Sequence, residues 1–208
     1  MTGLIEKLLR LRERSDVKAV VDNRLKEFKR IGMGSNNELF RELCFCLLTA
    51  NFNAERSIVI QREIEDGFLI LSESELAHEL RRLGHRYPNS RAKYIVSTRE
   101  HKDSFKNVVE SLSGESLREW FVKHIKGLGY KETSHFLRNI GFDDYAIIDF
   151  HVVNLLVKHG LIERPKRVTK KTYLKVEGVL KDVARKTGFS LAELDLYLWY
   201  METGKILK

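Results

Sequence analysis

The chain has 208 residues and carries 37 Lys and Arg against 29 Asp and Glu, a formal net charge of +8 that makes a polyanion the first partner to test. A hydrophobic content of 43% excludes wholesale disorder, and two cysteines exclude both a disulfide scaffold and any four-cysteine zinc or iron–sulfur site. Because no apolar run approaches the ~20 residues of a membrane span and the charged N-terminus lacks a signal-peptide core, we expect an intracellular protein without membrane contact.

Apolar residues recur at helical spacing along almost the whole chain. The first stripe begins at Leu4, Leu8 and Leu11 and continues to Phe28 after a break near residues 15–16. A start signal at 35–38 precedes an apolar helix over 39–50. Three further Ser-x-x-Glu pairs have the spacing of a capping box: Ser72 with Glu75, Ser116 with Glu119, and Ser190 with Glu193. The pattern predicts an all-α fold of about ten helices.

The segment 146–150 is apolar enough to resemble a strand, but it leads directly into helical spacing over 152–156. Pro165 lies in a short charged loop, and two more helices follow over 169–208. Since these are too short to fold alone, we expect them to pack back onto the amino-terminal helices. We therefore predict one unit, 1–208, built from two interwoven helical lobes with a cleft between them.

Gly127-Leu128-Gly129 forms a Gly-apolar-Gly turn between two amphipathic helices, in a hairpin that we place at 119–140. Such a turn lets the backbone approach another surface closely, and the free N–H groups at the start of the next helix suit a phosphate. Lys126 and Lys131 add positive charge. On spacing alone, an ordinary glycine-bearing helix connection is the more common explanation.

Asp149 lies within an apolar run, Ile147-Ile148-Asp149-Phe150, where an unpaired carboxylate would be costly to bury. One explanation is that Asp149 caps the following helix by accepting its free N–H groups. A catalytic carboxylate is another. The two roles are compatible, and we expect Asp149 to have both.

The hairpin, a lysine two residues after its second glycine, and Asp149-x-His151-Val152 about twenty residues later together resemble the helix-hairpin-helix DNA glycosylases. In that superfamily the lysine marks a bifunctional glycosylase and lyase. Residues 46–54 resemble the helix end from which these enzymes insert a polar side chain into DNA. Residues 197–208 resemble the tail of the compact type-2 8-oxoguanine DNA glycosylase/lyases of archaea and thermophilic bacteria. The resemblance implies a monomer that acts on duplex DNA containing an oxidised base.

Two departures from the family pattern are informative. Lys126 replaces the usual proline before the first hairpin glycine, which changes the rigidity of the turn but not its N–H groups. Cys44 and Cys46 cannot hold the iron–sulfur cluster of endonuclease III-like relatives, and we expect both to be buried apolar residues. No metal or other cofactor is needed for the implied reaction.

The resemblance implies that neutral Lys131 attacks the sugar C1′, expels the base and forms a Schiff base, with Asp149 assisting. β-Elimination then nicks the strand. A solvated lysine at a helix start is the alternative for Lys131, although a cation is unfavourable at that end of a helix.

Trp199 and Tyr87 are the candidates for stacking on a flipped base, although Trp199 also has the spacing of a core residue. The resemblance favours Trp199 and implies that the terminal carboxylate of Lys208 accepts the N7–H that 8-oxoguanine has and guanine lacks. Asn51 and Asn53 either contact DNA or cap the next helix. Asp195 is expected to be an exposed helix residue.

Residues 158–186 contain ten Lys and Arg but only three acidic residues. This run is either a solvated helix face or a phosphate-binding flank of the hairpin. Two other functions stay open: a glycosylase for another oxidised base, and a non-catalytic helix-hairpin-helix module that tethers a complex to DNA. Such a module has no use for the pair of Lys131 and Asp149.

Overall fold

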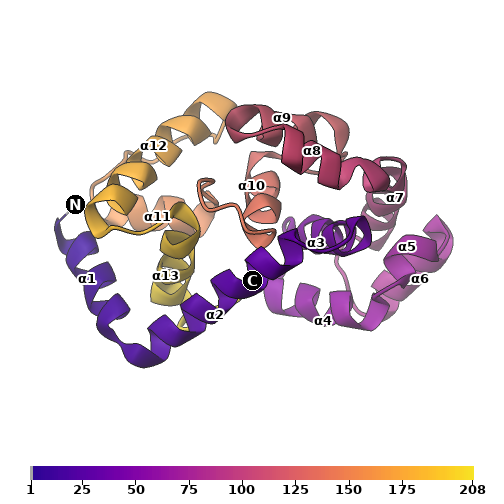
Figure 1. Cartoon of the computed structure of the whole chain (residues 1–208), viewed down its shortest axis with the longest axis horizontal. Helices are drawn as coiled ribbons and strands as arrows, with labels where there is room; N and C mark the ends of the chain where they lie inside the picture. Colours follow the sequence, from indigo (N-terminus) through magenta and orange to yellow (C-terminus); the bar gives the residue numbers. More distant parts are fainter. Residues whose placement is uncertain (1) are drawn as a thin grey trace. The chain divides into compact units, whose positions relative to one another are not determined.

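The computed structural model describes residues 2–208, and these form thirteen α-helices and one 3-10 helix without any strand (Figure 1). The all-α prediction is confirmed, with more helices than the expected ten because several are short. In chain order the elements are α1 (Thr2–Glu13), α2 (Ser15–Gly32), α3 (Asn36–Thr49), α4 (Ala54–Ile64), α5 (Gly67–Ile70), α6 (Glu73–Arg82), α7 (Pro88–Thr98), η1 (Arg99–Ser104), α8 (Phe105–Ser111), α9 (Gly114–His124), α10 (Tyr130–Asn139), α11 (Phe150–Lys158), α12 (Lys170–Thr187) and α13 (Leu191–Thr203).

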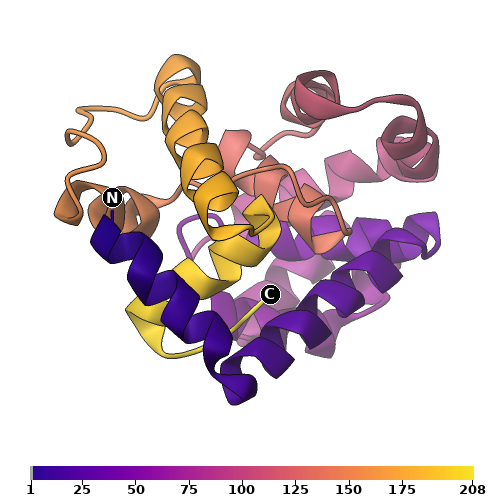
Figure 2. The same ribbon diagram turned by 60° about the vertical axis from the view of Figure 1, so that its left-hand side comes forward.

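One compact unit combines the chain up to Arg30 with the segment Leu137–Lys208. Here α1 packs against α12 and α13, and α11 packs against α13; Figure 2 shows the indigo α1 alongside the yellow α13. Leu4 and Leu8, which the periodicity placed on the buried face of α1, are fully buried. The prediction that 169–208 packs back onto the amino-terminal helices is confirmed.

The second unit is continuous, Ile31–Phe136, and is built around α3. Helices α4, α5, α7 and α8 and the 3-10 helix all pack on α3, which explains why its residues 43–48 are completely buried. Cys44 and Cys46 lie in this stretch and are both buried, as predicted. Burial raises the pKa of the Cys44 thiol well above its usual value, so the thiol is inert there.

The predicted helix starts are correct with one exception. Ser35 and Ser72 form complete capping boxes with Glu38 and Glu75, and Ser190 accepts the N–H of Glu193. Ser116 instead lies inside α9, where its hydroxyl donates to the carbonyl of Ser113 at 2.7 Å. No helix among residues 2–208 has the length and apolarity needed to cross a lipid bilayer.

Candidate functional site

The Gly127 turn between α9 and α10 has the geometry that requires glycine. Gly127 has a φ of +95°, and a Cβ atom at this position would lie 2.5 Å from Cδ2 of Tyr94. Leu128 is buried and anchors the turn, whereas Lys126 and Gly129 are exposed. Because the tyrosine ring packs directly on the glycine, the turn is a close-packed one rather than a loose connection.

We expected the N–H of Gly129 to be a free, outward-facing donor, but it already donates a hydrogen bond to Glu132. Glu132 reaches back so that its Oε2 accepts this N–H at 3.3 Å, while its Oε1 lies 3.9 Å from Nζ of Lys131. This is the carboxylate half of a capping box, with Gly129 as the capping residue. A phosphate that binds the Gly129 N–H must therefore displace the Glu132 carboxylate. The side chain of Lys131 is 26% exposed, so this lysine is not the fully solvated one of the alternative explanation.

A polar cluster on α9 fixes the start of α10 next to Lys131. The Tyr130 hydroxyl donates to Glu115 at 2.6 Å and lies 3.1 Å from an oxygen of Glu119. Arg118 is almost fully buried, pairs with Glu115 at 2.6 Å and donates to the Ser134 hydroxyl at 3.2 Å. Lys131 therefore projects from a helix turn that is held by its neighbours on both sides.

Arg91 links several predicted contact residues of this unit, and sequence reasoning missed it. Its Nη2 donates to the carbonyl of Ala50 at 2.6 Å, and its guanidinium lies 5.6 and 5.9 Å from the ring centroids of Tyr87 and Tyr94. Lys126 Nζ lies 5.9 Å from the same Tyr94 ring. The structure thus brings the turn after α3, Tyr87 and the hairpin into one connected set. Burial lowers the pKa of Arg91, which marks the cost of placing a guanidinium here.

The turn that joins α3 to α4 places the two predicted asparagines differently. Asn53 caps α4, since its side-chain oxygen accepts the N–H of Arg56 at 2.9 Å, and the capping alternative is correct for this residue. Asn51 is exposed and has a φ of +56°. A left-handed conformation is uncommon outside glycine, and its occurrence in an exposed turn is typical of functional loops.

His85 connects this turn to Tyr87. Its Nε2 is 3.0 Å from the carbonyl of Leu48, and its Nδ1 accepts the backbone N–H of Tyr87 at 3.0 Å. These partners require a neutral ring with the proton on Nε2. Burial lowers the pKa of His85, which favours the same neutral form.

Asp149 is the N-cap of α11, as predicted, and its Oδ1 accepts the N–H of Val152 at 2.9 Å. The preceding residues, which resemble a strand in sequence, form a buried segment without regular secondary structure that is held by α12. The Tyr173 hydroxyl donates to the carbonyl of Ala146 at 2.6 Å and accepts the N–H of Ile148 at 3.3 Å. Glu177, which is 4% exposed, accepts the N–H of Ala146 at 3.2 Å. These contacts fix the position of Asp149.

Trp199 and Lys208 lie in the same unit as Asp149. Trp199 is half-buried, its ring meets that of His151 edge-on at 5.4 Å, and its enclosed indole N–H has no hydrogen-bond partner within residues 2–208. Lys208 is half-buried beyond the end of α13. The expectation that Asp195 is an exposed helix residue is wrong, because its side chain is only 15% exposed and pairs with Arg138 at 3.1 Å. Lys131, the Gly127 turn, Tyr87 and Asn51 belong to the other unit.

The ten basic side chains of 158–186 are all exposed, which is compatible with both explanations of this run. Among residues 2–208, no group of three or more His, Cys, Asp or Glu could hold a metal ion.

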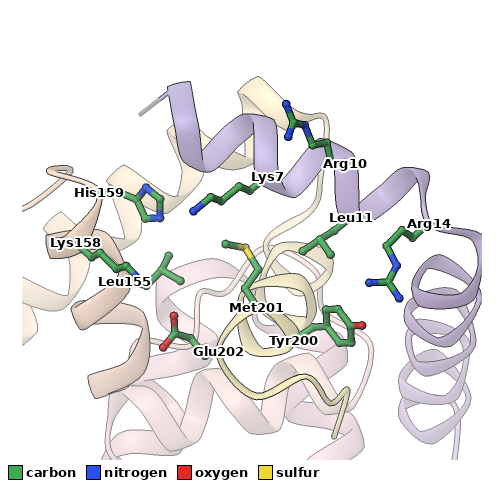
Figure 3. Close-up of a pocket in the computed structure, with 10 residues that line it drawn as sticks. All are labelled: Lys7, Arg10, Leu11, Arg14, Leu155, Lys158, His159, Tyr200, Met201 and Glu202. Atoms are coloured by element: carbon green, nitrogen blue, oxygen red, sulfur yellow. The ribbon is translucent and has the colours of Figure 1, made fainter.

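A cavity of about 430 Å³ lies at the far end of α11 from Asp149 (Figure 3). None of the predicted site residues lines it. Figure 3 shows Met201 at its centre and Lys7 extending toward His159. Burial lowers the pKa of His159, and the positive charges of Lys7 and Lys158 lower it further.

Known proteins share this sequence and fold over nearly their full length. The family model for 8-oxoguanine DNA glycosylase matches residues 21–189. A protein of Korarchaeum cryptofilum named 8-oxoguanine DNA glycosylase/AP lyase is 50% identical over 99% of this chain and 98% of its own, and one of the same name from Methanocaldococcus jannaschii is 49% identical over 99% of each.

Solved structures agree with these relatives. A crystal structure of Methanocaldococcus jannaschii 8-oxoguanine glycosylase/lyase with a 15mer DNA containing 8-oxoguanine covers 99% of this chain and 100% of its own, with a TM-score of 0.95 at 49% identity. The 8-oxoguanine DNA glycosylase of Thermotoga maritima gives a TM-score of 0.93 at 48% identity, over 100% of this chain and 99% of its own. The predicted helix-hairpin-helix fold is confirmed.

Proposed function

The chain belongs to the 8-oxoguanine DNA glycosylase family, and on that basis we propose that it is a DNA repair glycosylase with AP lyase activity that excises 8-oxoguanine from duplex DNA. The observation that carries the proposal is the 48–50% identity, over almost the whole chain, to relatives named 8-oxoguanine DNA glycosylase/AP lyase. The Methanocaldococcus jannaschii structure holds DNA with 8-oxoguanine, and we assign the same substrate here. We also propose that it acts inside the cell, as a monomer.

In the proposed mechanism Lys131 is the nucleophile. Its neutral amine attacks C1′ of the extruded nucleotide, a C–N bond forms, and the base leaves with the electron pair of the glycosidic bond. Opening of the sugar gives a Schiff base between Lys131 and C1′. Loss of a C2′ proton and departure of the 3′ phosphate then nick the strand by β-elimination. The half-buried position of Lys131, beside a turn held by Tyr130, supports this role because a nucleophile needs a fixed origin.

Asp149 assists by stabilising the positive charge that grows on the sugar and by taking part in proton transfer from Lys131. The geometry supports it, because the buried segment 145–148 holds the carboxylate in place. Only one of its oxygens has the Val152 N–H as its partner, so capping does not occupy the whole carboxylate.

DNA binds at the hairpin. The backbone of Gly127, Leu128 and Gly129 and the positive charge of Lys126 contact a phosphate. Asn51 is the better placed of the two asparagines to enter the duplex, because the Asn53 oxygen is already used as a cap. The exposed basic side chains of 158–186 add phosphate contacts. Each contact makes the slope of the logarithm of the binding constant against the logarithm of the salt concentration more negative by about 0.9.

For base recognition we propose Trp199 as the stacking surface and the carboxylate of Lys208 as the acceptor of the 8-oxoguanine N7–H. The indole N–H of Trp199, which lacks a partner within the described residues 2–208, supports a role in a ligand-binding region. Tyr87 is the weaker candidate, since its ring lies against Arg86 and Arg91.

The proposal is tested with three duplexes: 8-oxoguanine opposite cytosine, an oxidised pyrimidine opposite adenine, and undamaged DNA. We expect excision and strand nicking of the first only. Cleavage of the pyrimidine duplex alone would indicate a glycosylase for another lesion. Binding of all three without cleavage would indicate a non-catalytic DNA-binding module.

A further inference from the structure

Phe150 is an exposed aromatic residue next to the proposed catalytic carboxylate. It is the first residue of α11, directly follows Asp149 and is 67% exposed. Within residues 3–208, it is the only aromatic side chain among the exposed large hydrophobic ones. Its neighbours in α11, Val152 and Val153, are buried, so Phe150 does not belong to the core-facing side of this helix. A single exposed apolar residue is common by itself, so Phe150 is distinguished by its place beside Asp149 and by its ring contacts.

The Phe150 ring is held on one side by a row of other rings. Its centroid lies 3.8 Å from that of His151 at a tilt of 36°, and His151 meets Trp199 edge-on at 5.4 Å. The helix cap made by Asp149 fixes the backbone from which Phe150 projects. The aromatic row of Phe150, His151 and Trp199 therefore begins at the residue that follows Asp149 and extends to Trp199 through direct ring contacts.

We propose that Phe150 is a positioning residue that packs against the extruded nucleotide and stabilises its flipped-out state. This inference rests on the proposed function. Extrusion costs a few kcal/mol of stacking and pairing, and aromatic side chains in nucleic-acid sites compensate for such losses by offering a face for the base. Phe150 is suited to this because it is exposed and directly follows Asp149, the residue proposed to act at the sugar. Contact there also excludes water from the reacting centre.

The test compares Phe150→Ala, Phe150→Leu and Phe150→Tyr with Ile70→Ala, an equally simple truncation of a 76% exposed residue in the other unit. The substrate carries 8-oxoguanine opposite cytosine with 2-aminopurine as its 5′ neighbour, whose fluorescence rises when the lesion leaves the stack. Excision is measured in single turnovers at saturating enzyme, so that the rate reports events after binding.

We expect Phe150→Ala to lower the excision rate by about tenfold or more and to reduce the fluorescence rise. Phe150→Leu should stay impaired, and Phe150→Tyr should restore both signals because it keeps the aromatic face. Affinity for undamaged duplex should change less than about twofold, and thermal midpoints should shift little, since substitutions at exposed positions have small effects. Ile70→Ala should match the wild type.

Wild-type rates for Phe150→Ala would overturn the inference, as would full activity of Phe150→Leu, because an aromatic face would then be unnecessary. An equal loss in Ile70→Ala would attribute the effect to general loss of apolar surface and also overturn it. In all three cases an active wild type leaves the proposed function intact. A wild type that excises no 8-oxoguanine refutes the proposed function itself, and this inference with it.

Discussion

Substituting Asp149 by asparagine separates the two roles of this side chain, helix cap and catalytic carboxylate. In the structure Oδ1 accepts the N–H of Val152 at 2.9 Å, and an asparagine oxygen can accept the same bond. Asparagine and aspartate are about equally good caps, so the cap survives. Asp149→Asn loses only the favourable interaction of the negative charge with the helix dipole, which contributes about 0.3–1 kcal/mol to the free energy of unfolding. A loss of this size lowers the thermal midpoint of a protein of this length by at most about 4 °C.

Activity should respond on a different scale. Loss of a positioned acid or base typically costs 10²–10⁴ in rate, so we expect single-turnover excision of 8-oxoguanine by Asp149→Asn to fall by at least about a hundredfold. Affinity for the lesion duplex should stay within about twofold of the wild type, because asparagine has the same size and preserves the cap that positions this part of the chain.

The control is Ser190→Ala, which removes a cap of the same kind from α13, where the serine oxygen accepts the N–H of Glu193 at 3.0 Å. This variant should lose about 1 kcal/mol of stability and keep its activity. Near-wild-type excision by Asp149→Asn would refute the catalytic role. A parallel loss of DNA affinity and turnover would reduce Asp149 to a structural cap.

Three further predictions concern the hairpin and its support. Glu132→Gln keeps an acceptor for the Gly129 N–H but removes a negative charge from the phosphate site, so the Kd for duplex DNA should fall roughly fivefold, the equivalent of about 1 kcal/mol; an unchanged Kd in fluorescence anisotropy would contradict this. Gly127→Ala should cost about 1–3 kcal/mol in denaturant unfolding, because its φ is +95° and Tyr94 occupies the space, and should exceed Gly114→Ala, where φ is +54° and the space is open. Burial lowers the pKa of His85 in the folded protein, so the unfolded chain takes up the proton first as the pH falls below about 6.5. The free energy of unfolding therefore decreases from that pH down to the lower pKa of the folded state. The slope of this decrease is at most about 1.4 kcal/mol per pH unit. His85→Gln should flatten the stability profile between pH 7.5 and 5.5, and an unchanged slope would exclude His85 as its source.

The sequence contained the parts of the site that depend on local geometry. The Gly127 turn, the Asp149 cap and the capping boxes at Ser35 and Ser72 follow from residues that interact within four positions along the chain. The capping box predicted at Ser116 is wrong even though it depends on local geometry, because a serine and a glutamate three residues apart also occur inside a helix.

Contacts between distant segments could not be derived in the same way. Tyr173 and Glu177 hold the segment before Asp149 from 25–31 residues away, and Arg91 reaches Ala50 across 41 residues. Asp195 was misjudged for the same reason, since its partner Arg138 lies on another helix. Periodicity identifies the face of a helix that is buried, but it does not identify the side chain that meets it.

Borohydride trapping tests the central claim, that Lys131 forms the Schiff base, most directly. The wild type, Lys131→Gln and Lys126→Gln are incubated with duplex containing 8-oxoguanine opposite cytosine, reduced, and examined for a covalent protein–DNA adduct. Lys126 is the matched control because it is an exposed lysine of the same hairpin, and the enzyme is kept in saturating excess so that weaker phosphate binding does not limit trapping. We predict an adduct with the wild type and with Lys126→Gln, and none with Lys131→Gln. An adduct or strand cleavage that persists in Lys131→Gln would contradict the assignment of the nucleophile.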